Sequence, residues 1–205
     1  MTGVVLAAGA GRRLGRPKLL LPVGGRPLLA WVVDLVERLP LDERLIVLGG
    51  EAMAIREALF PARSDLLPPP GEGARASWRV VVNGAWQDGM GSSLRRAAEV
   101  VGGGMLVFLG DMPWVPEQAA REVLARAGDR PVAPAYNGQR GFPVYLPPSL
   151  RPEILHLSGD RGARDLLTNC EVIPWDDPGV VRDVDRMEDL PTPSSVGEEI
   201  ERAQG

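Results

Sequence analysis

The residues best suited to chemistry lie close to the N-terminus, in a loop rich in glycine and in positive charge. An apolar run from Val4 to Ala8 ends at Gly9, and the next nine residues carry three arginines and one lysine. Glycines let backbone N–H groups turn toward an anion, and arginine and lysine neutralise its charge. Because the whole chain has a net charge of -4, this local charge suits a small anion better than a nucleic acid. The loop from Gly9 to Lys18 is therefore predicted to bind a polyphosphate.

Two common phosphate-binding loops do not fit this stretch. A P-loop requires a hydroxyl residue directly after its lysine to reach magnesium, whereas Leu19 follows Lys18. A dinucleotide fingerprint requires G-x-G-x-x-G. Gly9 and Gly11 fit that pattern, but position 14 is Leu14, and the next glycine comes one residue late. The pattern disfavours both a P-loop NTPase and a dinucleotide-dependent oxidoreductase.

A carboxylate that follows another apolar run is the second candidate for chemistry. Asp111 comes directly after the run from Met105 to Gly110, and Met112 and Pro113 separate it from the next predicted helix. Since ligands bind at the carboxyl ends of parallel strands, Asp111 should lie at the same sheet edge as the loop. A carboxylate beside a triphosphate repels it unless a cation bridges the two, so Mg²⁺ is expected there.

Composition narrows the class of protein. The 205 residues suffice for one domain with a substantial core, and 44% hydrophobic with 24% charged residues is ordinary for a globular protein. Cys170 is the single cysteine and cannot form an internal disulfide, which fits a reducing cytoplasm. The N-terminal apolar run has neither the basic residues nor the length of a signal peptide, and no run approaches the ~20 apolar residues of a membrane span. We expect a cytoplasmic protein without a nucleic-acid or membrane partner.

Segments typical of strands and helices alternate along the chain. Apolar runs predict buried strands at residues 3–8, 44–49, 79–83 and 105–110. Amphipathic segments predict helices at residues 27–39, 51–60, 92–101 and 116–127. Pro27 is expected in the first turn of its helix, and Ser92 as an N-cap. Residues 131–136 and 141–147 predict two strands without a helix between them, before a helical region at 162–167 and a strand at 171–175.

This alternation predicts the fold class. Apolar strands separated by helices indicate a mostly parallel central sheet that is covered on both faces. We expect an α/β fold, a single-domain, Rossmann-like three-layer sandwich. Residues 61–77, rich in proline and glycine, are expected to form a surface loop.

The opening stretch also resembles a known family. LAAGAGRRLGRPKLLLPVGGRPLL contains L-A-A-G-x-x-x-R-x-G-x-x-K, which is similar to the signature of nucleotidyltransferases. It most resembles the molybdenum cofactor cytidylyltransferases of the MobA-like NTP transferase family, which have a nucleotide-diphospho-sugar transferase-like fold. The resemblance implies that Arg13 and Lys18 contact the triphosphate as catalytic residues together with Asp111. It implies a nucleotide site formed by Leu6, Ala7, Ala8, Gly9, Arg13, Lys18, Asn83 and Ser93.

Later motifs match the same family. The segment GMGSSL implies that Ser93 lies near the base or ribose, whereas N-capping is the simpler interpretation for Ser92. G-D-M-P matches the family's metal-binding aspartate, Asp111. VVRDVDRMEDL is similar to D-x-D-T-P-E-D-L, which implies a second metal ligand at Asp185, with Asp183 as the reserve. Arg186 and Met187 replace the usual Thr-Pro there.

The acceptor side is implied by two further segments, GQRGFPVYL and LSGDRGARDLL. Phe142 stands where relatives often carry a polar residue, and a structural salt bridge is the alternative role of Arg164. The acceptor residues implied by the resemblance are Arg140, Gly141, Pro143, Asp160 and Arg164. The expected domain spans residues 1–190, with the acceptor bound by about 131–170, and residues 191–205 form a polar tail or short helix.

The resemblance implies transfer of CMP from CTP to the phosphate of molybdopterin-bound molybdenum, with Mg²⁺ as cofactor. Ala8 favours CTP, because guanylyl-transferring relatives typically carry glycine there. A GTP-using transferase, a transferase for another phosphorylated acceptor and a non-catalytic cofactor-binding chaperone remain alternatives. A recipient molybdenum enzyme is the expected protein partner.

Overall fold

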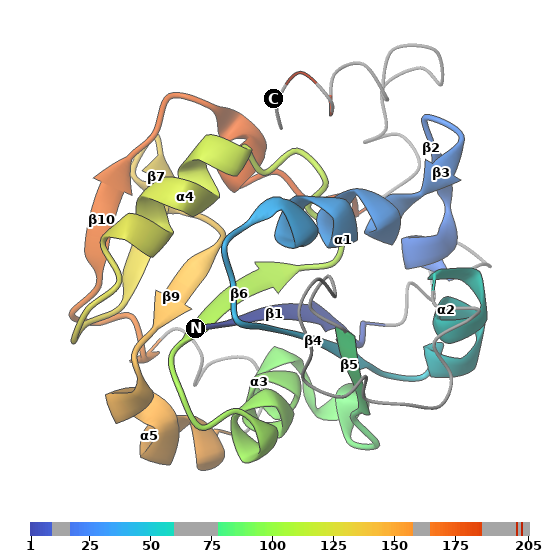
Figure 1. The fold of residues 1–205 in the computed structure, drawn as a ribbon, viewed down its shortest axis with the longest axis horizontal. Coiled ribbons are helices and arrows are strands. Elements are labelled where there is room, and N and C mark those ends of the chain that lie inside the picture. Colours follow the sequence, from blue (N-terminus) through green and yellow to red (C-terminus); the bar gives the residue numbers. More distant parts are fainter. Residues whose placement is uncertain (10–16, 60–77, 158–164, 186–199, 201, 203–205) are drawn as a thin grey trace.

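The computed structural model describes residues 1–9, 17–59, 78–157 and 165–185, together with residues 200 and 202. Its centre is an eight-stranded sheet in the order β10-β7-β9-β6-β1-β4-β5, with β8 paired to β7 (Figure 1). The strands of this sheet are β1 (Thr2–Ala7), β4 (Glu43–Leu48), β5 (Trp78–Val82), β6 (Met105–Leu109), β7 (Val132–Tyr136), β8 (Gln139–Arg140), β9 (Val144–Leu146) and β10 (Glu171–Pro174).

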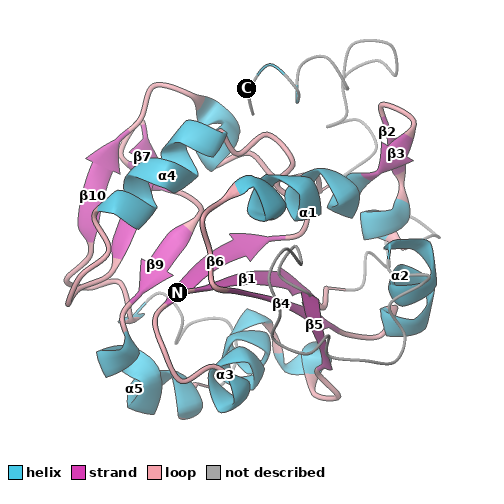
Figure 2. Cartoon of the chain, in the orientation of Figure 1, coloured by secondary structure: helices cyan, strands magenta, loops and turns pink. Residues whose placement is uncertain are grey.

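Helices cover both faces of the sheet (Figure 2). The helices are α1 (Leu28–Arg38), α2 (Ala52–Leu59), α3 (Met90–Val100), α4 (Glu117–Ala125) and α5 (Arg151–Leu155). Successive residues of β1 point to opposite faces, so this strand contributes to two apolar cores. Val5 packs in the cluster that contains α1 and α4, and Val4 in the cluster that contains α3 and α5. The predicted three-layer α/β architecture is confirmed.

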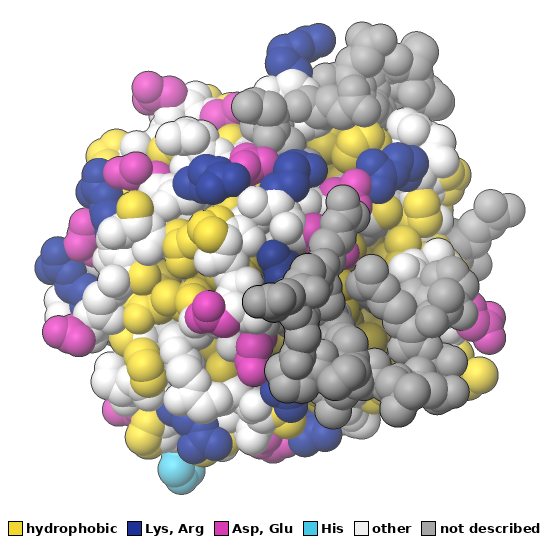
Figure 3. All heavy atoms as spheres, viewed as in Figure 1, with side chains coloured by type: hydrophobic (Ala, Val, Ile, Leu, Met, Phe, Trp, Pro, Cys, Tyr) yellow, Lys and Arg dark blue, Asp and Glu magenta, His cyan; other side chains and the backbone are white. Residues whose placement is uncertain are grey.

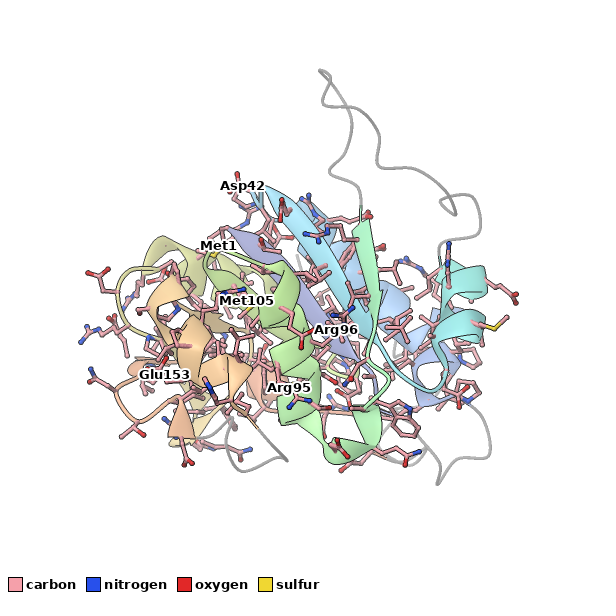
Figure 4. The ribbon with its side chains drawn as sticks, turned by 90° about the horizontal axis from the view of Figure 1, so that it is seen from below. Met1, Asp42, Arg95, Arg96, Met105 and Glu153 are labelled. Carbon is pink, nitrogen blue, oxygen red and sulfur yellow. The ribbon has the colours of Figure 1, made fainter. Side chains whose placement is uncertain are left out.

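Strand direction decides where polar residues gather. β1 is parallel to β4 and to β6, and β4 is parallel to β5. β9 is antiparallel to β6 and β7, so β7 runs in the same direction as β6, and β10 is parallel to β7. The sheet is therefore mostly parallel. Six of its strands have their carboxyl ends at the same edge of the sheet, which we call the carboxyl edge. Met1 and Asp42 form an ion pair at the other edge (Figure 4).

The predicted serine N-cap of α3 is wrong. The helix begins at Met90, and its N-cap is Gly89, whose φ of 93° and ψ of -179° suit glycine because a Cβ is unfavourable there. The Ser92 hydroxyl instead lies 2.8 Å from the carbonyl of Gly89 and 2.9 Å from that of Ala85. The short helix η3 (Trp86–Asp88) ends directly before Gly89, and α3 therefore begins ahead of both serines.

Several short helices and strands were not predicted from the sequence. The hairpin of β2 (Pro22–Val23) and β3 (Arg26–Pro27) turns at Gly24 and Gly25, so Pro27 precedes α1 rather than lying in its first turn. Helix α5 has five residues, too few for a periodic pattern. The predicted surface loop at 61–77, half of the helical region at 162–167 and most of the tail at 191–205 lie outside the described residues.

Candidate active site

The carboxyl edge brings together residues that follow four different strands. Ala8 and Gly9 follow β1, Gly49 follows β4 and Asn83 follows β5, while Asp111 comes two residues after β6. A Cβ on Gly49 would lie 2.2 Å from the carbonyl oxygen of Ala8, so glycine is required for this close approach of two backbones. The predicted nucleotide residues Leu6, Ala7 and Ala8 are buried, and Gly9 is exposed.

Lys18 lies between two carboxylates at this edge. Its side chain extends from the short helix η2 (Lys18–Leu20), and its Nζ lies 2.8 Å from Asp111 Oδ2 and 3.5 Å from Asp185 Oδ1. The Lys18 and Asp111 side chains are 12% and 27% exposed, whereas the Asp185 side chain is 71% exposed. The structure thus brings together three of the residues singled out from the sequence, from segments separated by up to 167 positions in the chain.

The segment that carries Asp185 is attached to the Asp111 loop through the main chain. The Val184 N–H donates to the carbonyl of Asp111 at 3.0 Å, and the Val184 side chain is fully buried. Asp183 is on the surface, yet its pKa is raised. Partial desolvation is the main cause, and the negative charges of Asp185 and Asp111 add to it. The Asp183 carboxylate therefore lies close enough to Asp185 and Asp111 to be repelled by both.

This donor set fits a divalent cation. Asp111 and Asp185 would supply oxygen ligands to such a cation, since Mg²⁺ typically binds one or two carboxylates together with substrate phosphates and water. A cation would relieve the repulsion by Asp185 and Asp111 that adds to desolvation in raising the pKa of Asp183. Within the described residues, no three His, Cys, Asp or Glu side chains form a ready-made metal site, so substrate oxygens would complete the coordination.

A buried polar network lies beside this site. The Asn83 side-chain amide donates to the hydroxyls of Ser92 at 2.8 Å and Ser93 at 3.0 Å, and its oxygen accepts from the Ala85 N–H at 2.9 Å. Asn83 and Ser93 are each 4% exposed. The network fixes the connection between β5 and α3. A nucleotide-binding role for Asn83 and Ser93 stays a prediction.

The described acceptor residues lie beside the Asp185 segment. The Phe142 N–H donates to the carbonyl of Val180 at 2.7 Å, and a Cβ on Gly141 would lie 2.0 Å from that oxygen. Pro143 follows a cis peptide bond, and the Arg140 guanidinium donates to the carbonyl of Leu167. The assigned acceptor roles stay predictions. Arg13, Asp160 and Arg164 lie outside the described residues.

The sequence interpretation missed a contact between Trp114 and Arg182. The guanidinium carbon of Arg182 lies 3.7 Å from the centroid of the Trp114 ring. Each residue is three positions from a carboxylate, Asp111 or Asp185, but no spacing rule pairs residues that far apart in the chain.

Comparison with known proteins gives the family. Residues 3–173 match the MobA-like NTP transferase domain. Nicotine blue oxidoreductase of Paenarthrobacter nicotinovorans is 35% identical, over 93% of this chain and 94% of that protein. The purine catabolism protein PucB of Bacillus subtilis is 27% identical, over 92% and 93% of the two chains.

Solved structures agree in fold. The crystal structure of Rv0371c from Mycobacterium tuberculosis has a TM-score of 0.74 and 28% identity, covering 92% of this chain and 94% of that one. A second structure of Rv0371c is a complex with manganese, with a TM-score of 0.68 and 26% identity over the same shares of the chains. No described helix is long and apolar enough to cross a membrane. The match over residues 3–173 places the chain among the nucleotidyltransferases, and it belongs to the MobA-like NTP transferase domain family.

Proposed function

We propose that the protein transfers CMP from CTP to the phosphate of molybdopterin-bound molybdenum and releases pyrophosphate. The observation that carries this proposal is the meeting of Lys18, Asp111 and Asp185 at the carboxyl edge of the sheet, where β1 also ends. One ammonium and two carboxylates at this place suit a magnesium-bound triphosphate. The family supports the reaction class, and the motif resemblance supplies the acceptor and the choice of CTP.

The chemistry requires no general base. An oxygen of the acceptor phosphate, already ionised at neutral pH, attacks the α-phosphorus of CTP. The new P–O bond forms as the bond to the bridging oxygen breaks, and pyrophosphate leaves with the electron pair. Lys18 and Arg13 neutralise the charge that grows on pyrophosphate, and the backbone at Gly9 orients the triphosphate. Mg²⁺ bound by Asp111 and Asp185 would neutralise charge on the phosphate oxygens.

The acceptor would lie on the side of β8 and β9. We assign it to Arg140, Gly141, Pro143, Asp160 and Arg164, as the motifs imply. We propose that the recipient of the finished cofactor is a molybdenum enzyme in the cytoplasm.

The test is pyrophosphate release from CTP, GTP and ATP, each with Mg²⁺ and molybdenum-loaded molybdopterin. We expect release with CTP and a loss of about 10²–10³-fold in Asp111→Asn, because the metal loses a ligand. Asp129→Asn is the matched control, since this exposed aspartate lies between α4 and β7, at the opposite sheet edge. Release with GTP instead would keep the mechanism and overturn the choice of base.

Two other classes of function are distinguished in the same assay. Tight pterin binding with no release from any nucleotide would indicate a cofactor-binding chaperone. The 35%-identical relative is named an oxidoreductase, so NAD(P)H oxidation is followed in parallel. Oxidation of NAD(P)H without pyrophosphate release would replace the transferase with a redox enzyme.

A further inference from the structure

Asp111 and Asp185 reach the site from segments that are distant in the sequence. Asp111 belongs to the connection from β6 to α4, which is anchored by its sheet strand and its helix. Asp185 lies in residues 181–185, which follow η5 (Pro178–Val180) and form neither helix nor strand. Correct placement of Asp185 therefore depends on contacts between the two segments.

The Asp185 carboxylate is 71% exposed and lies 3.5 Å from Lys18 Nζ, and an ion pair this exposed contributes little to a fixed geometry. The hydrogen bond from the Val184 N–H to the Asp111 carbonyl joins the backbones of the two segments next to Asp185. A side-chain contact between the two segments would orient the carboxylate further.

The Arg182 guanidinium supplies such a contact on the Trp114 ring, 3.7 Å from its centroid. Trp114 is 2% exposed, and its buried Nε1 has no hydrogen-bond partner among the described residues, so packing and this stack hold the indole. Next to it, a Cβ on Gly179 would lie 2.1 Å from the Trp114 carbonyl oxygen. The Asp185 segment thus touches the Asp111 loop at Gly179, Arg182 and Val184.

We propose that the Arg182–Trp114 stack positions Asp185 opposite Asp111 for binding of the divalent cation. This inference rests on the metal site of the proposed function. Arg182 and Trp114 do not touch the cation or the substrate in this proposal; they act through the orientation of the Asp185 segment. Residues that support metal ligands in this way typically change metal affinity by about 10–100-fold.

The test measures Mn²⁺ affinity of the full-length protein without nucleotide, from the electron paramagnetic resonance signal of free Mn²⁺. Arg182→Met keeps the aliphatic stem but loses the charge, and Trp114→Leu keeps Arg182 but loses the ring. We expect each to weaken Mn²⁺ binding about tenfold. The double variant should be no weaker than either single one, because both changes break the same stack. Arg182→Lys and Trp114→Phe, which preserve a cation and a ring, should restore most of the affinity.

Arg96→Met is the matched control, since Arg96 is a partly exposed arginine on α3 that pairs with Glu99 (Figure 4). Unchanged Mn²⁺ affinity in Trp114→Leu would overturn the proposal, because the metal site would then be intact without the ring on which Arg182 stacks. Equal losses in Arg96→Met would also overturn it.

Folding is checked by circular dichroism in EDTA. If Trp114→Leu does not fold, the comparison of Arg182→Met with Arg182→Lys decides, and equal Mn²⁺ affinity in those two variants overturns the proposal. Failure of the proposed function looks different: the unmodified protein would itself bind no Mn²⁺ and release no pyrophosphate.

Discussion

Lys18 Nζ lies 2.8 Å from Asp111 Oδ2, and it is the only lysine in the sequence. Together with its 3.5 Å approach to Asp185, this contact places an ammonium between the two carboxylates proposed to bind the metal. The ammonium and a divalent cation would therefore compete for the same oxygens, and Lys18 would be released toward the phosphates when the cation binds.

Lys18→Met should consequently separate metal binding from catalysis. Without nucleotide, we expect Mn²⁺ affinity to rise about tenfold, because a positive charge within a few ångströms of the cation is removed. With CTP, pyrophosphate release should fall about 10²–10³-fold, because the leaving group loses its cation. Mn²⁺ titration and steady-state kinetics measure the two effects. Weaker Mn²⁺ binding in the variant would contradict the competition.

Ala8→Gly should alter the choice of nucleotide. Ala8 is buried, and β4 ends against its carbonyl, so loss of the methyl group would widen a crowded part of the site. A single methyl group is typically worth about 10–200-fold in selectivity, and we expect the ratio of kcat/KM for CTP over GTP to fall by at least the lower figure. Ala98→Gly, a buried alanine in α3, is the control. An unchanged ratio of kcat/KM for CTP over GTP in Ala8→Gly would contradict this explanation.

Asn83→Ala should destabilise the protein by about 2–3 kcal/mol, because it leaves buried partners of the amide without their hydrogen bonds. Those partners are the hydroxyls of Ser92 and Ser93 and the N–H of Ala85. Urea unfolding followed by circular dichroism measures the loss. Asn169→Ala changes the same residue type at an exposed position and should be nearly neutral. Similar values for the two variants would show that the network contributes little.

Arg44→Ala should cost about 3 kcal/mol of unfolding free energy. Arg44 is 8% exposed, and its guanidinium donates to carbonyls at the end of α1, including those of Val36, Glu37 and Leu39. Charge at a helix C-terminus adds to this stabilisation. Arg44→Lys should recover part of the loss, since one ammonium reaches fewer carbonyls. Thermal and urea unfolding, with Arg96→Ala as the surface control, test the ordering of the variants.

Glu117 should contribute to acid sensitivity. Basic and acidic side chains are interspersed over α1 and α4 (Figure 3), and Glu117 accepts hydrogen bonds from Arg38 and Arg121. Burial alone would raise its pKa, but these two arginines together lower it below the usual 4.5. A lowered pKa gives stability that is present above the unfolded value and lost as pH falls through the folded one.

Between pH 7 and about 5, Glu117→Gln should therefore be less stable than the unmodified protein, and the difference should shrink below pH 4.5. Urea unfolding across that range measures it. Glu153→Gln, at an exposed position of α5, should show no such convergence. A constant difference at every pH would mean that the ionised carboxylate of Glu117 is not the cause.

The sequence by itself determined the longer strands and helices and most of the candidate residues. Buried strands such as Met105–Leu109 and amphipathic helices such as Leu28–Arg38 have periodic patterns that are local in the chain, and their alternation implies a mostly parallel sheet. Once the sheet is parallel, Gly9 and Asp111 must lie at its carboxyl edge, so that part of the site follows from the pattern alone.

Only the tertiary structure decided which distant residues meet. The placement of Asp185 near Lys18 and the stack of Arg182 on Trp114 depend on a segment whose backbone has no periodic pattern to predict. The start of α3 likewise depended on Gly89 and on carbonyls that engage the Ser92 hydroxyl, against the preference of serine for the N-cap. Such contacts join residues far apart in sequence or override a local preference by packing, and neither is encoded in the spacing of residue types.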